Sequence, residues 1–361
     1  MPNQILTRAI DALASKRDLS ADQTAEVLAE IMHGDVSEIQ IAGFLIALRT
    51  KGETVEELAG LARTMRALAA HVPSDRDDLL DTAGTGGGRS SFNVSTTAAL
   101  IAAGAGCAVA KHGNRSATSR SGSADLLEAL GARIDLGPKA VAACIDEAGF
   151  GFMFAPAHHQ ATRFVVPVRS ELAVRTIFNL LGPLTNPAGA RRQLIGVADP
   201  GFLETMAGAL ARLGVDRALV VAGEDGLDEV SADAPTKVAE VNGEEISHYV
   251  LTPEQVGLAP SDGLASEQAP GGTPDENAAV TRAILQGERV GGVGARGEAL
   301  AVINAGAAIY AGGVTDSIAE GVQAARAALA DGRAASALER YVQASRRHAP
   351  ADPERLTEAA R

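Results

Sequence analysis

Apolar side chains recur every three or four positions through the first seventy residues. Leu6, Ile10 and Leu13 share one helical face. Similar stripes follow at 27–32, 41–48 and 58–65. Each later stripe is preceded by a possible capping box, namely Ser20 with Gln23, Ser37 with Gln40 and Thr54 with Glu57. This pattern predicts four amphipathic helices joined by short connections, and hence a small helical bundle over 1–72.

From Pro73 onward, short apolar runs alternate with glycine-rich turns and helical stripes, which is typical of a mainly parallel sheet covered by helices. The expected strands are Leu79–Thr82, Val109–Ala110, a run beginning at Ile134, Phe152–Phe154, Ile195–Val197 and Ala218–Ala222. The expected helices are Ser95–Ala105, Ser123–Leu130, Ala140–Ala148, Phe202–Leu213 and most of the chain from Asn277 on. Lys237–Val241 and Ile246–Leu251, joined by Asn242-Gly243, predict a β-hairpin. The fold class is therefore α/β, with an N-terminal helical bundle domain and a larger α/β domain over 73–361.

The amino-acid composition limits which kinds of molecule the protein could bind. The 361 residues are 46% hydrophobic and 21% charged, as in folded proteins of about two domains. A net charge of −13 and 3% aromatic residues without Trp argue against nucleic-acid binding. The longest weakly polar run, Ala98–Ala110, is too short to span a membrane, and the first twenty residues lack the apolar core of a secretory signal. Cys107 and Cys144 lie in apolar segments, so we expect buried thiols in a cytoplasmic protein.

A glycine run between the first predicted strand and the next helix is the first candidate site. Gly84-Thr85-Gly86-Gly87-Gly88 lets a backbone approach a ligand closely, and Asn93, Ser95 and Thr96 open the helix. Free amides at a helix start bind anions such as phosphate. An ordinary tight turn with an N-cap is the alternative, which four clustered glycines make less favoured.

Lys111-His112-Gly113-Asn114-Arg115-Ser116 follows the next strand and should open at the same sheet edge. Lys111 and Arg115 can neutralise phosphate, while Ser119 and Ser123 offer hydroxyl groups. Two such loops side by side favour a ligand with more than one phosphate group. A solvated basic turn is the alternative for this segment.

Two further segments carry weaker signals. Asp228 and Glu229 follow the strand Ala218–Ala222, and adjacent carboxylates of this kind can hold Mg²⁺ together with substrate phosphates, although a surface acidic turn is commoner. Arg169 can bind a carboxylate through its planar guanidinium. His158 and His159 are not expected to form a paired metal site, since neighbouring side chains diverge in regular elements; we expect them to be structural or to support a neighbouring site residue. No Ser-His-Asp or Cys-His nucleophile pattern stands out.

In this order, the segments resemble the anthranilate phosphoribosyltransferase family nearly end to end. The longest matches are Phe92–Thr96, Lys111–Ser116, Ser121–Asp125, Arg175–Asn179, Leu181–Pro187 and Gly226–Glu229. The resemblance implies a nucleoside phosphorylase/phosphoribosyltransferase-like fold, in which a return segment near 167–188 packs with the helical domain. It also implies a homodimer formed through the helical domains, with the active site between the two domains.

The implied reaction joins anthranilate to phosphoribosyl diphosphate, releases diphosphate and is the second step of tryptophan synthesis from chorismate. By resemblance, phosphoribosyl diphosphate binds Gly84, Gly87, Gly88, Ser91, Asn93, Val94, Ser95, Thr96, Lys111, His112, Gly113, Asn114, Arg115, Ser116, Ala117, Thr118, Ser119 and Ser123. Anthranilate contacts Gly84, His112, Asn114, Arg169 and Pro183. Ser95, Asp228 and Glu229 match Mg²⁺ ligands, and the catalytic assignments are Lys111, Arg115 and Arg169.

One position departs from the family pattern, which usually has Asp after the GTGG sequence. Here Gly88 stands in its place, and the stretch before Phe92 is one residue shorter. This loses a carboxylate near the diphosphate, while Arg89 adds a positive charge. We expect restoring Asp at Gly88 to change the Mg²⁺ optimum.

Two rival functions remain open from the sequence. A pyrimidine nucleoside phosphorylase has a similar architecture, but is generally longer and carries a lysine pattern in its glycine loop that is absent here. The second rival is a nucleic-acid-binding relative without transferase activity. The net charge of −13 and the intact 111–116 loop argue against it.

Overall fold

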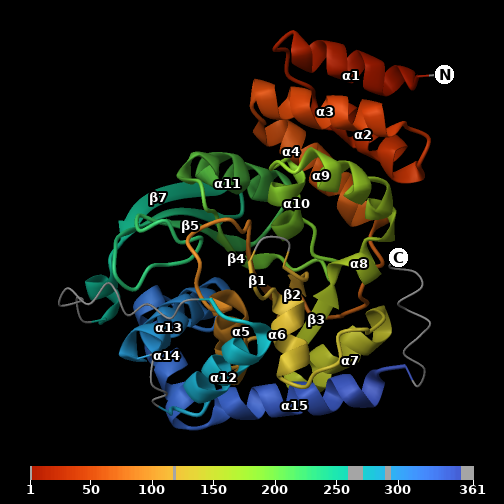
Figure 1. Ribbon diagram of the computed structural model, residues 1–361. Coiled ribbons are helices and arrows are strands. Elements are labelled where there is room, and N and C mark those ends of the chain that lie inside the picture. Colours follow the sequence, from red (N-terminus) through yellow and green to blue (C-terminus); the bar gives the residue numbers. More distant parts are fainter. Residues whose placement is uncertain (1, 117–118, 259–270, 289–293, 351–361) are drawn as a thin grey trace.

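The computed structural model describes residues 2–116, 119–258, 271–288 and 294–350. Four helices open the chain and pack as a bundle, at one end of the molecule in Figure 1: α1 (Gln4–Ala14), α2 (Ala21–His33), α3 (Glu38–Lys51) and α4 (Val55–Leu68). Ser20 and Thr54 form the expected capping boxes. The third box was wrong in part. Ser37 caps α3, but Gln40 bonds the backbone of Asn3 instead and so joins the starts of α1 and α3.

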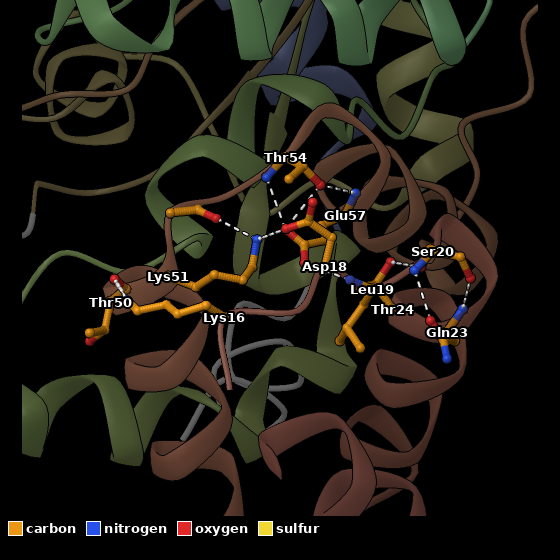
Figure 2. Close-up of polar contacts among 11 residues, drawn as sticks. Lys16, Asp18, Leu19, Ser20, Gln23, Thr24, Thr50, Lys51, Thr54 and Glu57 are labelled. Atoms are coloured by element: carbon orange, nitrogen blue, oxygen red, sulfur yellow. Dashed lines mark hydrogen bonds and ion pairs between the residues drawn. The ribbon is translucent and has the colours of Figure 1, made fainter. Parts of the chain in front are cut away.

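Glu57 joins the connection before α2 to the connection before α4, as Figure 2 shows. Its fully buried carboxylate accepts hydrogen bonds from Leu19 N (2.9 Å), Thr54 N (2.9 Å) and Lys51 Nζ (3.0 Å). Lys51 also bonds Asp18 Oδ1 at 2.7 Å. Because these partners come from the loop before α2, the end of α3 and the residue before α4, this one side chain holds three parts of the bundle together.

A seven-stranded sheet forms the centre of the larger domain, in the order β3-β2-β1-β4-β5-β6-β7. The strands are β1 (Leu80–Gly84), β2 (Val109–Gly113), β3 (Phe150–Phe154), β4 (Arg192–Gly196), β5 (Arg217–Gly223), β6 (Thr236–Asn242) and β7 (Glu245–Leu251). The first five are parallel, and the last two form the expected antiparallel hairpin. Strand order reverses between β1 and β4, which is where ligands bind in sheets of this type.

Helices cover both faces of the sheet (Figure 1). The helices after the bundle are α5 (Val94–Gly104), α6 (Ser123–Ala129), α7 (Pro138–Ala148), α8 (Ala155–His158), α9 (Val166–Leu172), α10 (Phe178–Leu184), α11 (Leu203–Arg212), α12 (Pro274–Leu285), α13 (Gly294–Ala311), α14 (Ile318–Ala330) and α15 (Arg333–His348). Short 3₁₀ turns span Gln160–Phe164, Pro200–Phe202 and Pro253–Val256. The helices predicted around 95–105, 123–130, 140–148 and 202–213 are confirmed within a few residues. No described helix is long and apolar enough to span a bilayer.

The strand predicted to begin at Ile134 is wrong. Ile134 is buried in the core, but residues 132–137 form no regular element. The neighbouring amide of Arg133 donates to Ser345 Oγ of α15 (3.0 Å) rather than to a strand. A short apolar run is equally compatible with a buried loop, because the spacing of apolar residues does not show whether a neighbouring strand is there to pair with.

Two hydrophobic clusters lie on opposite faces of the sheet. Leu219 faces a cluster formed with α5, α7, α13, α14 and α15, while its neighbour Val220 faces a cluster shared with the helical bundle, α10 and α11. The second cluster also includes Val168, Ile177 and Leu181 from the segment between β3 and β4. That segment is held to the bundle by Arg66 Nε, which donates to Leu184 O at 2.7 Å, so the bundle is anchored over the sheet edge.

Candidate active site

The glycine-rich loop leaves β1 and is held at the sheet edge by backbone hydrogen bonds. Thr85 N donates to Gly196 O at the end of β4 (2.9 Å), and Arg89 N donates to Gly226 O in the loop after β5 (2.8 Å). Gly87 has a φ of 82°, a conformation that favours glycine. The loop therefore lies over the carboxyl ends of β1, β4 and β5, where the strand order reverses.

Three glycines make room for Asp228. Its Oδ2 accepts a hydrogen bond from Gly86 N at 3.0 Å. A Cβ atom at Gly84 would lie 2.9 Å from Oδ2, one at Gly88 2.6 Å from Oδ1, and one at Gly196 only 1.7 Å from the carbonyl oxygen of Asp228. The glycines are therefore required by the close approach of the acidic loop as well as by the turn itself.

Placing Asp at Gly88 should therefore disturb the site. We expect Gly88→Asp to raise the Mg²⁺ concentration for half-maximal activity by about tenfold, because its Cβ crowds Oδ1 of Asp228 and a second carboxylate repels the first. A magnesium titration of the initial rate measures this, with Gly88→Ala separating crowding from charge. If both variants keep the wild-type optimum, the position is only a turn.

Asp228 and Glu229 form an acidic pair with little compensating charge. Burial raises the pKa of both carboxyl groups, and the neighbouring Asp228 raises that of Glu229 further. The amide of Ser95 and the ammonium of Lys111 act in the opposite direction at Glu229. In the described part of the chain, no group of three or more His, Cys, Asp or Glu residues could hold a metal ion alone. The pair fits Mg²⁺ that takes its remaining oxygen ligands from substrate and water.

Lys111 points inward from β2. It is almost fully buried, and its Nζ donates to Thr82 O at 2.5 Å and to Thr82 Oγ1 at 3.3 Å. Burial lowers the pKa of Lys111, while Asp81 and Glu229 raise it. Asp81 is itself buried and accepts from His112 N at 3.1 Å. The lysine therefore supplies the positive charge beneath the acidic pair.

Arg115 is tied to the helix that follows its loop. Its Nη1 lies 2.7 Å from Asp125 Oδ1 and 2.5 Å from Glu128 Oε2, both on α6. These two carboxylates raise the pKa of Arg115. Asp125 Oδ2 also accepts from Ser116 N (3.2 Å) and Gly122 N (2.9 Å), which holds both residues against the start of α6.

Three neutral histidines line the region beside the lysine. His112 Nδ1 lies 3.2 Å from Gly182 O, and its ring centroid is 5.0 Å from that of His159. Burial lowers the pKa of His112 and His158, and lowers that of His159 to about 4. Among the described residues, no hydrogen-bond partner is found for their buried Nε2 atoms. Pro183, a predicted anthranilate contact, directly follows Gly182. His112 and His159 therefore lie beside the candidate substrate region.

Arg169 and Arg175 come from the segment that returns to the bundle. The guanidinium carbon of Arg169 lies 5.5 Å from the ring centroid of Phe178 at the start of α10, and burial lowers its pKa. Arg175 donates to Gly86 O, and its own carbonyl accepts from Arg49 Nη1 of α3 at 2.8 Å. Sequence reasoning noted the 175–179 motif but gave Arg175 no role. Its contact links the helical bundle to the glycine loop.

The residues predicted for phosphate binding are positioned by β1, β2, the start of α5 and the loop before α6. They are Gly84, Gly87, Gly88, Ser91, Asn93, Val94, Ser95, Thr96, Lys111, His112, Gly113, Asn114, Arg115, Ser116, Ser119 and Ser123. Ala117 and Thr118 lie outside the described residues. β1 and β2 are neighbours in the parallel sheet, so the loops that follow them open at one edge, as predicted.

Comparison with known proteins identifies the group to which this arrangement belongs. A model of the glycosyl transferase family a/b domain matches residues 76–335, and one of the helical bundle domain of that family matches 7–69. A protein of Rubrobacter xylanophilus named anthranilate phosphoribosyltransferase is 51% identical over 95% of this chain and 98% of its own length. The chain belongs to the anthranilate phosphoribosyltransferase family.

Further members support the assignment. The anthranilate phosphoribosyltransferase of Moorella thermoacetica is 48% identical over 94% of this chain and 98% of its own. The crystal structure of the family member from Thermus thermophilus superposes with a TM-score of 0.86 at 48% identity, covering 94% of this chain and 99% of that one. The member from Saccharomyces cerevisiae, solved in complex with phosphoribosyl diphosphate and Mg, gives 0.84 at 27% identity, over 95% and 98%. Family membership confirms the predicted fold class.

Proposed function

We propose that this enzyme transfers the phosphoribosyl group of phosphoribosyl diphosphate to the amine of anthranilate. The products are N-(5-phosphoribosyl)anthranilate and diphosphate, in the second step of tryptophan biosynthesis from chorismate. The observation that carries the proposal is the convergence of a glycine loop, a helix start and an acidic pair at the strand-order reversal. The full-length similarity to relatives named for this activity supports it.

The phosphate site comprises the two loops and the start of α5. The amides of Gly87 and Gly88 in the glycine loop and that of Thr96 at the start of α5 provide donors for phosphoryl oxygens, since the neighbouring amides are bonded within the protein. Mg²⁺, bound through Asp228, Glu229 and Ser95, would neutralise charge on the diphosphate. The raised pKa of the two carboxyl groups supports this, because a divalent cation would relieve their mutual repulsion. The Saccharomyces relative was solved with both phosphoribosyl diphosphate and Mg.

Anthranilate is assigned to the region lined by Gly84, His112, Asn114, Arg169 and Pro183. Arg169 attracts its carboxylate, and the neutral imidazole of His112 adds no competing charge. The amine is an aniline that is largely unprotonated near pH 7, so no general base is required. The protein's task is to hold the amine against the ribose carbon.

Departure of diphosphate is the harder half of the reaction. The bond from the ribose carbon to the leaving oxygen breaks as the amine nitrogen bonds to the opposite face, and the amine then loses a proton to solvent. Loop amides stabilise the charge that develops on the leaving group. Lys111 acts through its electrostatic effect on Glu229, and Arg115 offers a guanidinium at the second loop that Asp125 and Glu128 hold in place.

The direct test is incubation with phosphoribosyl diphosphate, Mg²⁺ and anthranilate, following loss of anthranilate fluorescence and release of diphosphate. Equal rates of the two signals support the proposal. Phosphate-dependent cleavage of pyrimidine nucleosides, without these signals, would assign the chain to the phosphorylase alternative. A shift of single-stranded DNA without diphosphate release would favour the nucleic-acid-binding alternative.

Arg169→Ala should mainly weaken capture of anthranilate. We expect its apparent KM for anthranilate to rise by about 10- to 100-fold, since a charge-assisted pair contributes roughly 1.5–3 kcal/mol, while KM for phosphoribosyl diphosphate stays within twofold. Steady-state kinetics with each substrate varied in turn measure both. Arg163→Ala, an exposed arginine stacked on Phe164 in the same segment, is the matched control. An unchanged KM for anthranilate would remove Arg169 from the site.

We also propose that the protein forms a homodimer through its helical domain. On α3, Ile39 is 84% exposed and Ile46 is 37% exposed, and the two lie seven residues apart on one face. The other face of α3 packs Ile41, Phe44 and Leu45 into the bundle. A helix that is apolar on both sides calls for a second partner, and a copy of the same surface is the simplest.

Charged residues on that outer face should separate the subunits. We expect the Ile39→Glu/Ile46→Glu variant to sediment as a monomer at micromolar concentration, where the parent protein sediments as a dimer. Val250→Glu, at another exposed apolar residue, 49% exposed on β7, should leave the mass unchanged. A monomeric parent protein contradicts the proposed dimer.

We assign two domains, 1–72 and 73–361, with the segment at 167–188 returning to the first. The family models at 7–69 and 76–335 support this division. We also propose a cytoplasmic location, supported by the two buried free thiols, Cys107 and Cys144, which suit a reducing compartment.

A further inference from the structure

Two polar pairs join α5, which begins at the phosphate site, to α12 from the far end of the chain. Asn277 Nδ2 donates to Asn93 Oδ1 at 2.7 Å, and one turn further along both helices the hydroxyls of Thr97 and Thr281 lie 2.9 Å apart. Each pair spans 184 residues of sequence. The equal spacing fixes the register of the two helices, which lie together beneath the sheet in Figure 1.

Asn277 is buried with its amide hydrogen-bonded at both ends. Only 2% of it is exposed, its Oδ1 accepts from Gly272 N at 2.8 Å, and its Nδ2 holds Asn93. Asn93 in turn accepts from Ser121 Oγ and donates to Ser121 O, each at 3.0 Å. The chain Asn277–Asn93–Ser121 thus connects α12, the first phosphate loop and the second phosphate loop.

The network also determines what the side chain of Asn93 does. Asn93 occupies the N-cap position of α5, yet it makes no capping hydrogen bond. Its oxygen is engaged by Asn277 and Ser121 instead. Since Val94 N donates to Phe92 O and the Ser95 amide acts on Glu229, the amide of Thr96 is the one that this arrangement leaves for a ligand. Without Asn277, the Asn93 carboxamide would be free to rotate and cap its own helix.

The segment before α12 is fitted to the same loop. A Cβ atom on Gly271 would lie 2.5 Å from Ser91 O and 2.9 Å from Ser90 Oγ. This close approach brings the backbone preceding Asn277 against the stretch between the glycine run and α5. The start of α12 is therefore shaped to the first phosphate loop over several residues.

We propose that Asn277 is a positioning residue for the phosphoribosyl diphosphate site, acting through Asn93 and without contact to substrate. The inference rests on the proposed function, since it takes the loops at 84–96 and 111–123 as the phosphate site. Asn277 sets the separation of the two loops and keeps Asn93 from capping α5, which leaves the amide of Thr96 accessible.

Asn277→Leu tests the inference, because leucine keeps the shape and removes both hydrogen bonds. We expect the Kd for phosphoribosyl diphosphate, measured by calorimetry with Mg²⁺ and without anthranilate, to rise by about tenfold, with kcat at saturation within twofold. Thr281→Val breaks the neighbouring pair, one turn away from the loop, and is the matched control. It should lower the melting temperature comparably and leave Kd unchanged. Equal effects of the two variants on Kd, or no effect of either, overturn the inference.

Asn93→Ala separates this inference from the site assignment. If it leaves Kd unchanged, the proposed site itself is wrong. If it weakens binding while Asn277→Leu does not, only the role of Asn277 is wrong. The double variant should bind no more weakly than Asn93→Ala alone, since both changes interrupt one path. Should Asn277→Leu fail to fold, Asn277→Asp replaces it, because this variant places an oxygen against Asn93 Oδ1. The same rise in Kd is expected, and an unchanged Kd again overturns the inference.

Discussion

Glu229→Gln should leave a folded enzyme that needs far more Mg²⁺ and turns over about 100-fold more slowly at saturation. The amide keeps the shape of Glu229 but removes a full charge from the acidic pair. Initial rates across a magnesium titration give both quantities. Glu224→Gln, an exposed acid in the same loop, is the matched control and should behave as the parent enzyme. An unchanged magnesium requirement would remove Glu229 from the metal site.

The same residue gives a pH signature. Burial and Asp228 hold the pKa of Glu229 well above its ordinary value, so protons compete with the cation there. Lowering the pH should therefore weaken the apparent affinity of the parent enzyme for Mg²⁺. In Glu229→Gln that pH dependence should shrink, because the competing proton is gone.

Lys111→Met should destabilise the folded protein by about 3–5 kcal/mol and abolish measurable turnover, because it removes the buried cation whose charge acts on two buried carboxyl groups. Methionine fills most of the volume of the lysine stem, so the loss is electrostatic. Asp81 and Glu229 are the carboxylates left without their cation. Urea denaturation measures the free energy of unfolding.

Lys237→Met is the control for that variant. Lys237 is an exposed lysine on β6, so its replacement should change the free energy of unfolding by less than about 0.5 kcal/mol. If Lys111→Met shifts the urea midpoint no more than this control does, the buried lysine is not the counter-charge of the acidic pair.

Local patterns in the sequence predicted most elements of the fold. The bundle helices, the parallel strands and the 236–251 hairpin each depend on short-range periodicity and turn residues, which the sequence shows directly. The strand expected at Ile134 was wrong because an apolar run does not reveal whether a pairing partner exists. The Ser37/Gln40 box was wrong in part because Gln40 found a better partner in Asn3, 37 residues away.

The sequence predicted the loops of the candidate site, but fewer of the residues that hold those loops in place. Glycine runs and clustered polar residues mark ligand-binding turns within a few residues of one another. Asn277 and Arg175 act across long sequence separations, so no local pattern exposes them. Lys111 was identified, but its inward orientation follows from Thr82 and Asp81 on the neighbouring strand, which only the folded sheet brings together.

The hydrophobic cluster shared by the helical bundle and one face of the sheet has a consequence for how such enzymes can be recombined. Val220 and Ala222 of β5 belong to the same apolar core as Leu28 and Phe44 of the bundle. Exchanging the first seventy residues with those of a relative would pair surfaces that did not evolve together. A working chimera would therefore have to carry over the matching strand positions and the return segment as one unit.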